Sequence, residues 1–301
     1  MMSSKNHPRD LRAEGLMLIC VVIWGSNYAI SKYGISGMSP MIFNALRYLL
    51  AAAILNGYFL VGPRWTALTV SDWRNLIRAG LVANVMYQVA FIIGLSLTSA
   101  ANSAIILATS PLWTVLLHAR LHREPIEGRM LGGMLLSLAG IVMIVLGSGK
   151  RVEFGNLSLL GDGICLAASF LWALNTNLQK PLVGRHPPTQ VALVMISVGA
   201  VGLSVLAIPS LVQESWEIVR WTHVLAAVVS AVLSIAVANV IWLVGVKHLG
   251  PSATANVGNL IPVVALAISI FVLGETFDGV QLIGSSVALA GIWIARVPRG
   301  T

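Results

Sequence analysis

Residues 79–117 read AGLVANVMYQVAFIIGLSLTSAANSAIILATSPLWTVLL and contain no charged side chain over 39 positions. A single helix of this length would extend roughly 58 Å at about 1.5 Å per residue, far beyond the ~30 Å hydrocarbon core of a bilayer. The stretch therefore predicts two membrane-spanning helices that are joined by a turn at Ser96-Leu97-Thr98-Ser99.

The rest of the chain is also rich in apolar residues and poor in charged residues. Its 301 residues are 57% hydrophobic and 10% charged, whereas a soluble domain carries about 25% charged residues. Apolar runs fill nearly the whole length, which excludes an ordinary cytosolic enzyme and a single-pass receptor. They predict an all-α membrane protein with ten transmembrane helices, near 15–31, 41–61, the two parts of 79–117, 129–147, 162–180, 190–208, 223–246, 253–273 and 279–296.

The basic side chains test this count and give an orientation. The 19 Lys and Arg residues are thinly spread, without the basic stripe that is typical of nucleic-acid binding. If the N-terminus is cytoplasmic, 14 of the 19 lie on the cytoplasmic side, four lie outside, and Arg47 remains in the membrane. Cytoplasmic loops carry such an excess, so we predict that both termini are cytoplasmic.

The two halves of the sequence resemble each other. The run from Trp24 to Lys32 aligns with the run from Trp172 to Lys180 at an offset of 148. Further along, the offset is 151 and relates Gly94, Ala104, Pro111, Glu124 and Gly128 to Gly245, Ala255, Pro262, Glu275 and Gly279. We interpret residues 1–150 and 151–301 as two five-helix repeats around a central cavity, and an odd helix number inverts the second repeat. Inverted repeats are typical of secondary transporters, which bind substrate near the midplane.

Two prolines distinguish this reading from the simple duplication of a structural bundle. Pro111 and Pro262 occupy equivalent predicted helices, where a proline frees backbone carbonyls that only protein or a water-filled cavity can satisfy. We therefore predict helix breaks with a gating role at Pro111 and Pro262. Glycines at sevenfold spacing, Gly133, Gly140 and Gly147, are interpreted instead as close-packing contacts.

Several short motifs, in this order, resemble a known family. The first half contains Trp24-Gly-Ser-Asn27, Gly37-Met-Ser-Pro40 and Leu97-Thr-Ser-Ala-Ala101, and the second half contains Leu249-Gly-Pro-Ser252, Leu273-Gly-Glu275 and Gln281-Leu-Ile-Gly284. Over nearly its whole length the chain resembles EamA-type members of the drug/metabolite transporter superfamily. One departure is Leu121-His-Arg-Glu124, where the family usually has Leu-Gly-Glu. The resemblance implies a ten-helix transporter of metabolites, commonly an exporter, and bacterial members of the YddG type export aromatic and other amino acids. We expect a protein of the bacterial inner membrane that works as a monomer without a cofactor.

Amide and aromatic side chains interleave on the predicted helix faces. Helix 79–97, for example, carries Asn84, Tyr87, Gln88 and Phe91 on one stripe. Such a lining suits an amphipathic metabolite with a polar head and an apolar side chain. The alternative is that intramembrane amides only hold helices together and that aromatic residues form interface belts, which we favour for residues near helix ends such as Asn44. We predict that the substrate-binding residues are Trp24, Asn27, Tyr28, Arg47, Asn84, Tyr87, Asn102, Trp113, Trp172, Asn175, Asn239, Trp242, Asn256 and Asn259.

Arg47 is the one basic residue well inside a predicted helix. A guanidinium binds a carboxylate through two parallel hydrogen bonds, so Arg47 is a candidate partner for a substrate carboxylate. The alternative is a side chain that reaches the outer surface or pairs with carbonyl groups. The sequence leaves both open.

The acidic residues bear on the mechanism. None of the 11 falls in the middle of a predicted helix, and only Glu124, Asp162 and Glu275 lie at helix ends. Proton-coupled transporters use an intramembrane relay of Asp, Glu or His, so we expect facilitated diffusion by alternating access, with proton coupling as the alternative. His118 and His122 are four residues apart but lack a third ligand, so we expect no metal site. We rank an integral-membrane enzyme, a channel, and a carrier of another metabolite or drug below an amino-acid exporter.

Overall fold

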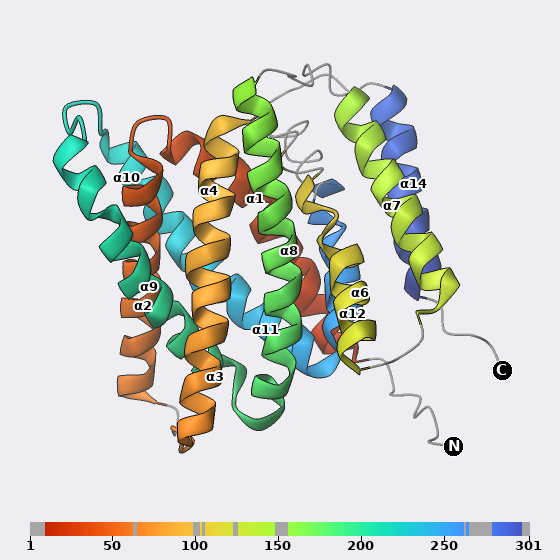
Figure 1. Ribbon diagram of the computed structural model, residues 1–301, viewed down its shortest axis with the longest axis horizontal. Coiled ribbons are helices and arrows are strands. Elements are labelled where there is room, and N and C mark those ends of the chain that lie inside the picture. The colour runs from red at the N-terminus through yellow and green to blue at the C-terminus, as the bar shows by residue number, and fades with distance from the viewer. Residues whose placement is uncertain are drawn as a thin grey trace.

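The computed structural model describes residues 10–62, 65–98, 103, 106–122, 126–147, 156–261, 263–264 and 279–296, and these residues form helices joined by short turns. In chain order the helices are α1 (Leu11–Gly34), α2 (Pro40–Val61), α3 (Val70–Gly80), the π-helix η1 (Leu81–Met86), α4 (Tyr87–Leu97), α6 (Ser110–His122), α7 (Gly128–Gly147), α8 (Asn156–Arg185), α9 (Pro188–Gln213), α10 (Trp221–Val229), the π-helix η2 (Ser230–Val237), α11 (Ala238–His248), α12 (Pro251–Gly258) and α14 (Gly279–Arg296). Figure 1 shows them as one bundle.

Six of the described helical segments are long and apolar enough to cross a membrane. The segment α3–η1–α4 is continuous from Val70 to Leu97, and α10–η2–α11 is continuous from Trp221 to His248. Apolar parts of α7 and α14 add two shorter helices. The chain is therefore a helical, multi-pass membrane protein.

Most predicted helix bounds lie within a few residues of the observed ones, and two of the larger differences have a common cause. The predicted turn at 96–99 is confirmed, because α4 ends at Leu97. The helix predicted from residue 79 begins nine residues earlier, at Val70, and Asp72 lies in its first turn, where it forms a capping box with Thr69. Similarly, α8 begins at Asn156, so Asp162 lies in its second turn rather than at its end. A search for charge-free runs misses helical turns that carry charges.

Corresponding helices share bounds at a nearly constant offset. The segments that begin at Val70 and at Trp221 are each 28 residues long and 151 residues apart, and each contains a π-helix. Helices α7 and α14 also begin 151 residues apart, whereas α2 and α9 begin at Pro40 and Pro188, 148 residues apart. Proline in the first helical turn is favoured because its missing N–H would be unpaired there.

Two helix interruptions occur at corresponding places. Turns occupy residues 108–109, just before α6, and residues 259–260, just after α12. Thr109 closes the first turn, because its backbone N and its Oγ1 both donate to the Ile106 carbonyl, at 3.1 and 2.6 Å. Pro111 is the second residue of α6, so the turn at 108–109 directly precedes this proline. The predicted break at Pro262 lies outside the described residues, although the turn at 259–260 precedes it.

Small residues bring α7 and α14 together at one side of the bundle (Figure 1). A Cβ atom at Gly140 would collide with the backbone of Ala288, and one at Gly133 would approach Gly291 and Ala295. The close-packing interpretation is confirmed for these two glycines.

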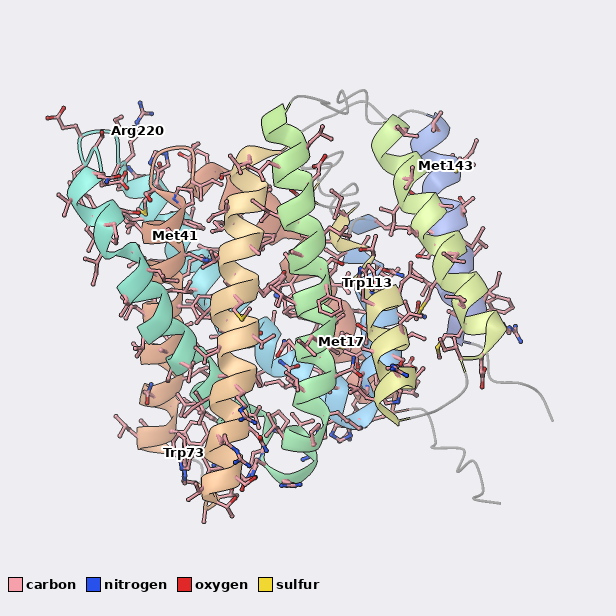
Figure 2. The ribbon with its side chains drawn as sticks, in the orientation of Figure 1. Met17, Met41, Trp73, Trp113, Met143 and Arg220 are labelled. Atoms are coloured by element: carbon pink, nitrogen blue, oxygen red, sulfur yellow. The ribbon has the colours of Figure 1, made fainter. Side chains whose placement is uncertain are left out.

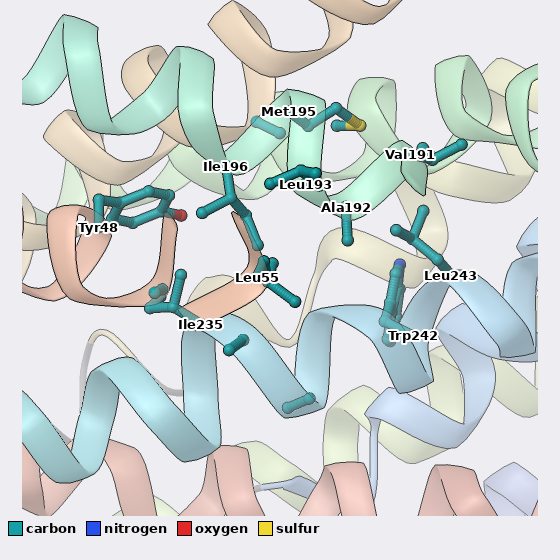
Figure 3. Close-up of a cluster of buried hydrophobic side chains, with 14 of the residues drawn as sticks. Tyr48, Leu55, Val191, Ala192, Leu193, Met195, Ile196, Ile235, Trp242 and Leu243 are labelled. Atoms are coloured by element: carbon teal, nitrogen blue, oxygen red, sulfur yellow. The ribbon is translucent and has the colours of Figure 1, made fainter. Parts of the chain in front are cut away.

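The largest apolar core lies where α2, α9 and α11 meet. Figure 3 shows Tyr48 and Leu55 of α2 facing Ile196 of α9, and Trp242 of α11 directed toward Ala192. The ends of the bundle carry polar or amphipathic residues, and Figure 2 shows Trp73 at one end and Arg220 at the opposite end. Each end also has a lysine that caps a neighbouring helix: Lys32 donates to the Leu95 carbonyl at 2.8 Å, and Lys180 donates to the Val246 carbonyl at 3.1 Å.

Candidate functional site

A cavity of about 90 Å³ lies inside the bundle, where α1, α2, α4, α8, η2, α11 and the two helix interruptions converge. Nine of the predicted substrate-binding residues line it, namely Trp24, Asn27, Tyr28, Arg47, Tyr87, Trp172, Asn239, Trp242 and Asn259. The interleaving of amide and aromatic side chains that the sequence predicted is therefore present in one place.

Aromatic rings form a connected part of the lining of this cavity. The centroids of Trp24, Trp172 and Trp242 are 5.1 to 5.2 Å from one another, so the three indoles contact each other pairwise. Tyr87 extends the cluster, because its ring centroid is 4.9 Å from that of Trp172, and Phe91 stacks on Tyr87 at 5.9 Å. This continuous aromatic surface suits an apolar or aromatic substrate side chain.

The π-helix η2 makes part of this arrangement possible. A π-turn widens the backbone, so some carbonyl groups lose their usual partner four residues later. The Ser234 carbonyl, in η2, accepts hydrogen bonds from Trp24 Nε1 at 3.1 Å and from Asn239 Nδ2 at 3.2 Å. The widened turn therefore fixes one indole and one amide against the cavity.

Arg47 lines the cavity and is 1% exposed. Its Nη1 donates to Ser31 Oγ at 3.0 Å and Ser230 Oγ at 3.1 Å, and its Nη2 donates to Asn44 Oδ1 at 2.8 Å and Gln88 Oε1 at 3.0 Å. All four partners are neutral, and no ion pair of Arg47 occurs in the described part of the chain. The Arg47 side chain does not reach the surface of the protein. The alternative that it extends to the outer surface is therefore excluded.

The neutral partners come from four different helical segments. Ser31 belongs to α1, Asn44 to α2, Gln88 to α4 and Ser230 to η2, and Ser230 Oγ donates in turn to Asn27 Oδ1 at 2.6 Å. Such a network fixes the guanidinium in place, but within the described ranges of the chain it leaves the positive charge without a carboxylate. A bound anion would supply that missing charge.

Other predicted residues lie elsewhere. Asn84 accepts a hydrogen bond from Tyr48 Oη at 3.1 Å, and Trp113 contacts Phe170 with ring centroids 5.9 Å apart. Asn175 is fully buried, and Asn256 donates to the Ile292 carbonyl at 3.2 Å. None of these four residues lines the cavity, and Asn102 lies outside the described residues.

The prediction also missed several lining residues. Gln88 and Phe91 share the helix face of Tyr87, so the sequence contained a signal for them. Ser234 and Ile235 lie in η2, and no sequence pattern marked that π-turn. The interpretation of Asn44 as a residue that holds helices together agrees with its bonds, since its Nδ2 also donates to the Gln88 carbonyl at 3.1 Å.

Comparisons with known proteins agree with this architecture. The EamA-like transporter family matches the chain twice, over residues 11–146 and 159–297. A "Probable amino-acid metabolite efflux pump" of Salmonella typhimurium is 25% identical over 93% of this chain and 93% of its own length, and a protein of the same name from Escherichia coli K12 is 24% identical over 94% of each chain.

Two further similarities extend over almost the whole chain. An "Uncharacterized transporter" of Archaeoglobus fulgidus is 24% identical over 99% of each chain. A solved crystal structure with 18% sequence identity superposes with a TM-score of 0.76 over 95% of this chain and 97% of that chain, which shows a shared fold. Because the two family matches together cover most of its length, the chain belongs to the EamA-like transporter family.

Proposed function

We propose that this transporter exports amino acids, with aromatic and other apolar ones favoured, from the cytoplasm across a bacterial inner membrane. The observation that carries the proposal is a buried arginine that lines an aromatic cavity in a member of a transporter family and has no carboxylate partner among the described residues. A substrate carboxylate would bind Arg47 through charge-assisted hydrogen bonds. The names of the two efflux pumps are consistent with this substrate class.

We further propose that residues 1–150 and 151–301 are inverted five-helix repeats, which make ten transmembrane helices in a chain that works as a monomer. The double family match and the shared helix bounds support this division. The excess of basic residues supports cytoplasmic termini. Substrate would reach the cavity alternately from either side, as in other transporters built from inverted repeats.

The volume of the cavity fits an alternating mechanism. At about 90 Å³ it is smaller than the ~300–1,000 Å³ of typical ligand pockets. A large amino acid would therefore enter only after the tryptophan rings move apart. The two helix interruptions at 108–109 and 259–260 border the cavity and are the proposed places of that movement.

No acidic side chain among the described residues lines the cavity. We therefore propose facilitated diffusion down the substrate gradient, without a carboxylate proton relay.

The test is counterflow of labelled phenylalanine in liposomes that contain the purified protein. We expect saturable counterflow without a pH gradient, as for a carrier. We also expect Arg47→Gln to lower this flux about 10- to 100-fold, because charge-assisted hydrogen bonds contribute about 1.5–3 kcal/mol. The same variant should transport phenethylamine, which lacks the carboxylate, at an unchanged rate.

Arg78→Gln is the matched control, because it removes an exposed arginine from α3 and should leave both fluxes unchanged. Normal phenylalanine flux in Arg47→Gln would contradict the role of Arg47. Flux that appears only under a proton gradient would overturn facilitated diffusion, and movement of sugars or nucleotides alone would overturn the substrate class.

A further inference from the structure

The face of α8 that borders the cavity continues beyond it with two buried polar side chains. Asn175 and Gln179 are 0% and 2% exposed, and neither lines the cavity. Both amide atoms of Asn175, and Oε1 of Gln179, have no hydrogen-bond partner among the described residues. At 3.6 residues per turn, both positions lie within about 60° of Trp172 around the helix, so they follow Trp172 on one face of α8.

This face of α8 runs alongside α11. Trp172 lines the cavity and contacts Trp242 of α11, with ring centroids 5.1 Å apart. Eight residues after Trp172, Lys180 Nζ donates to the Val246 carbonyl of α11 at 3.1 Å. Because α8 is one continuous helix from Asn156 to Arg185, the two amides lie along it between these two contacts.

The two ends of the bundle show where this face leads. Arg185, in the last turn of α8, places Nη1 3.4 Å from the carboxylate of the residue before Trp73, which Figure 2 shows at one end. The last turn of α1 leads to the opposite end, because Tyr33 Oη is 2.7 Å from Thr222 Oγ1, two residues after Arg220. The two amides of α8 therefore lie between the cavity and the end of the bundle that carries Trp73.

The corresponding face of α1 has polar residues that are partnered. Asn27 and Ser31 lie 148 residues before the two amides of α8. Asn27 Oδ1 accepts from Ser230 at 2.6 Å, and Ser31 Oγ accepts from Arg47 Nη1 at 3.0 Å. Corresponding positions of the two halves therefore differ, because only those of α1 have these groups satisfied within the described protein.

Buried polar atoms without a partner are rare, because burial removes their water and returns nothing. Polar residues inside a membrane protein mark the paths of substrates. A conformation in which α8 and α11 separate at Lys180 would return water to both amides. We infer that Asn175 and Gln179 line a path between the cavity and the end of the bundle at Lys180, and that this conformation has the path closed. The inference rests on the proposed function and adds the route by which substrate enters from the cytoplasmic side.

Cysteine labelling tests this path. Cys20→Ala and Cys165→Ala remove the native thiols, and Asn175→Cys or Gln179→Cys then adds one. In sealed membrane vesicles of each orientation, we expect a membrane-impermeant maleimide to label both positions from the side that labels His248→Cys, at the exposed end of α11. Labelling from the opposite side, or no labelling, would overturn the inference.

Asn177→Cys is the matched control on the same helix. Asn177 lies between the two positions and is 6% exposed, and its Nδ2 donates to the Thr114 carbonyl of α6 at 3.2 Å. Its Oδ1 also lacks a partner in the described part of the chain, so the control separates the face of the helix from the lack of a partner. We expect Asn177→Cys to remain unlabelled. Equal labelling at all three positions would indicate a general loosening of α8 and would overturn the path.

Two further substitutions should change the labelling rates in opposite directions. Lys180→Met removes the contact with α11, so labelling of Asn175→Cys should become about tenfold faster, the ratio that corresponds to one charged hydrogen bond. Asn175→Leu removes the desolvation penalty of the closed conformation, so labelling of Gln179→Cys should become about tenfold slower. Unchanged rates, or changes opposite to these, would contradict closure of the path at Lys180.

Counterflow of labelled phenylalanine in the same vesicles separates the two proposals. The expected labelling pattern in a protein that moves no amino acid would support the path and overturn the proposed transport. Saturable phenylalanine counterflow without labelling of Asn175→Cys and Gln179→Cys would overturn the path and leave the transport proposal standing.

Discussion

Asn27 and Asn175 lie at corresponding positions, three residues after Trp24 and Trp172, but their surroundings differ. Asn27 Oδ1 accepts from Ser230 at 2.6 Å and so joins the network around Arg47. Asn175 is fully buried, and within the described residues neither atom of its amide has a partner.

The substitutions at two further positions account for this difference. Arg47 is seven residues after Pro40, and seven residues after Pro188 the chain has Met195. Ser230 is the tenth residue of the segment that begins at Trp221, and the tenth residue of the segment that begins at Val70 is Ala79. Of these two similar backbone frameworks, only one therefore carries a hydrogen-bond network around a buried arginine.

The largest expected effect on stability comes from removing the amide of Asn27, which has a hydrogen-bond partner. Asn27→Leu leaves Ser230 without its acceptor beside a buried guanidinium, so we expect the free energy of unfolding to fall by about 2 kcal/mol. Denaturant unfolding in detergent micelles measures this change. An unchanged free energy of unfolding would mean that the hydrogen-bond network around Arg47 does not make Asn27 differ from Asn175.

The corresponding substitution at Asn175 should change the free energy of unfolding in the opposite direction. Asn175→Leu replaces a buried amide, for which the described part of the chain offers no partner, with an apolar side chain of similar size. We expect the free energy of unfolding to rise by about 1.5 kcal/mol, because the desolvation penalty of the amide disappears. A lower value in the same assay would indicate that Asn175 has a partner that this conformation does not contain.

The smallest expected difference in the free energy of unfolding is between substitutions at Trp24 and Trp172. Trp24 donates to the Ser234 carbonyl at 3.1 Å, and the described hydrogen bonds include none from the indole of Trp172. We expect Trp24→Phe to lower the free energy of unfolding by about 1 kcal/mol more than Trp172→Phe. Because both changes remove similar ring area from the same cluster, each serves as the control for the other, and equal losses would contradict the role of the hydrogen bond.

The helix bounds were predictable where the positions of charged residues and the length of an apolar run alone determine them. Helix α14 was predicted at 279–296 and occurs there, and the predicted second helix differs from α2 by one residue. Helix periodicity also placed nine residues at one cavity. Helix periodicity did not predict the place of Asn175. Residues on one face of a helix point in a range of directions, and only packing determines which of them face the cavity.

The network of Arg47 was beyond sequence reasoning. Its partners come from α1, α2, α4 and η2, and hydrogen bonds between helices far apart in the chain follow from tertiary packing. Ser230 is a small hydroxyl residue in an apolar run, and nothing in the local pattern distinguishes it from a residue in contact with lipid.

The two π-helices also affect how the protein exchanges hydrogen for deuterium. Tyr87 N donates to the Val82 carbonyl and Ala238 N donates to the Leu233 carbonyl, each across five residues in the middle of a long helix. Helix α9 has no such turn from Pro188 to Gln213. Backbone amides exchange through local opening, and the cavity is lined by Ser234 and Ile235 in η2 and by Tyr87 directly after η1. Deuterium should therefore enter these two helices from their middles, while in α9 it enters from the ends.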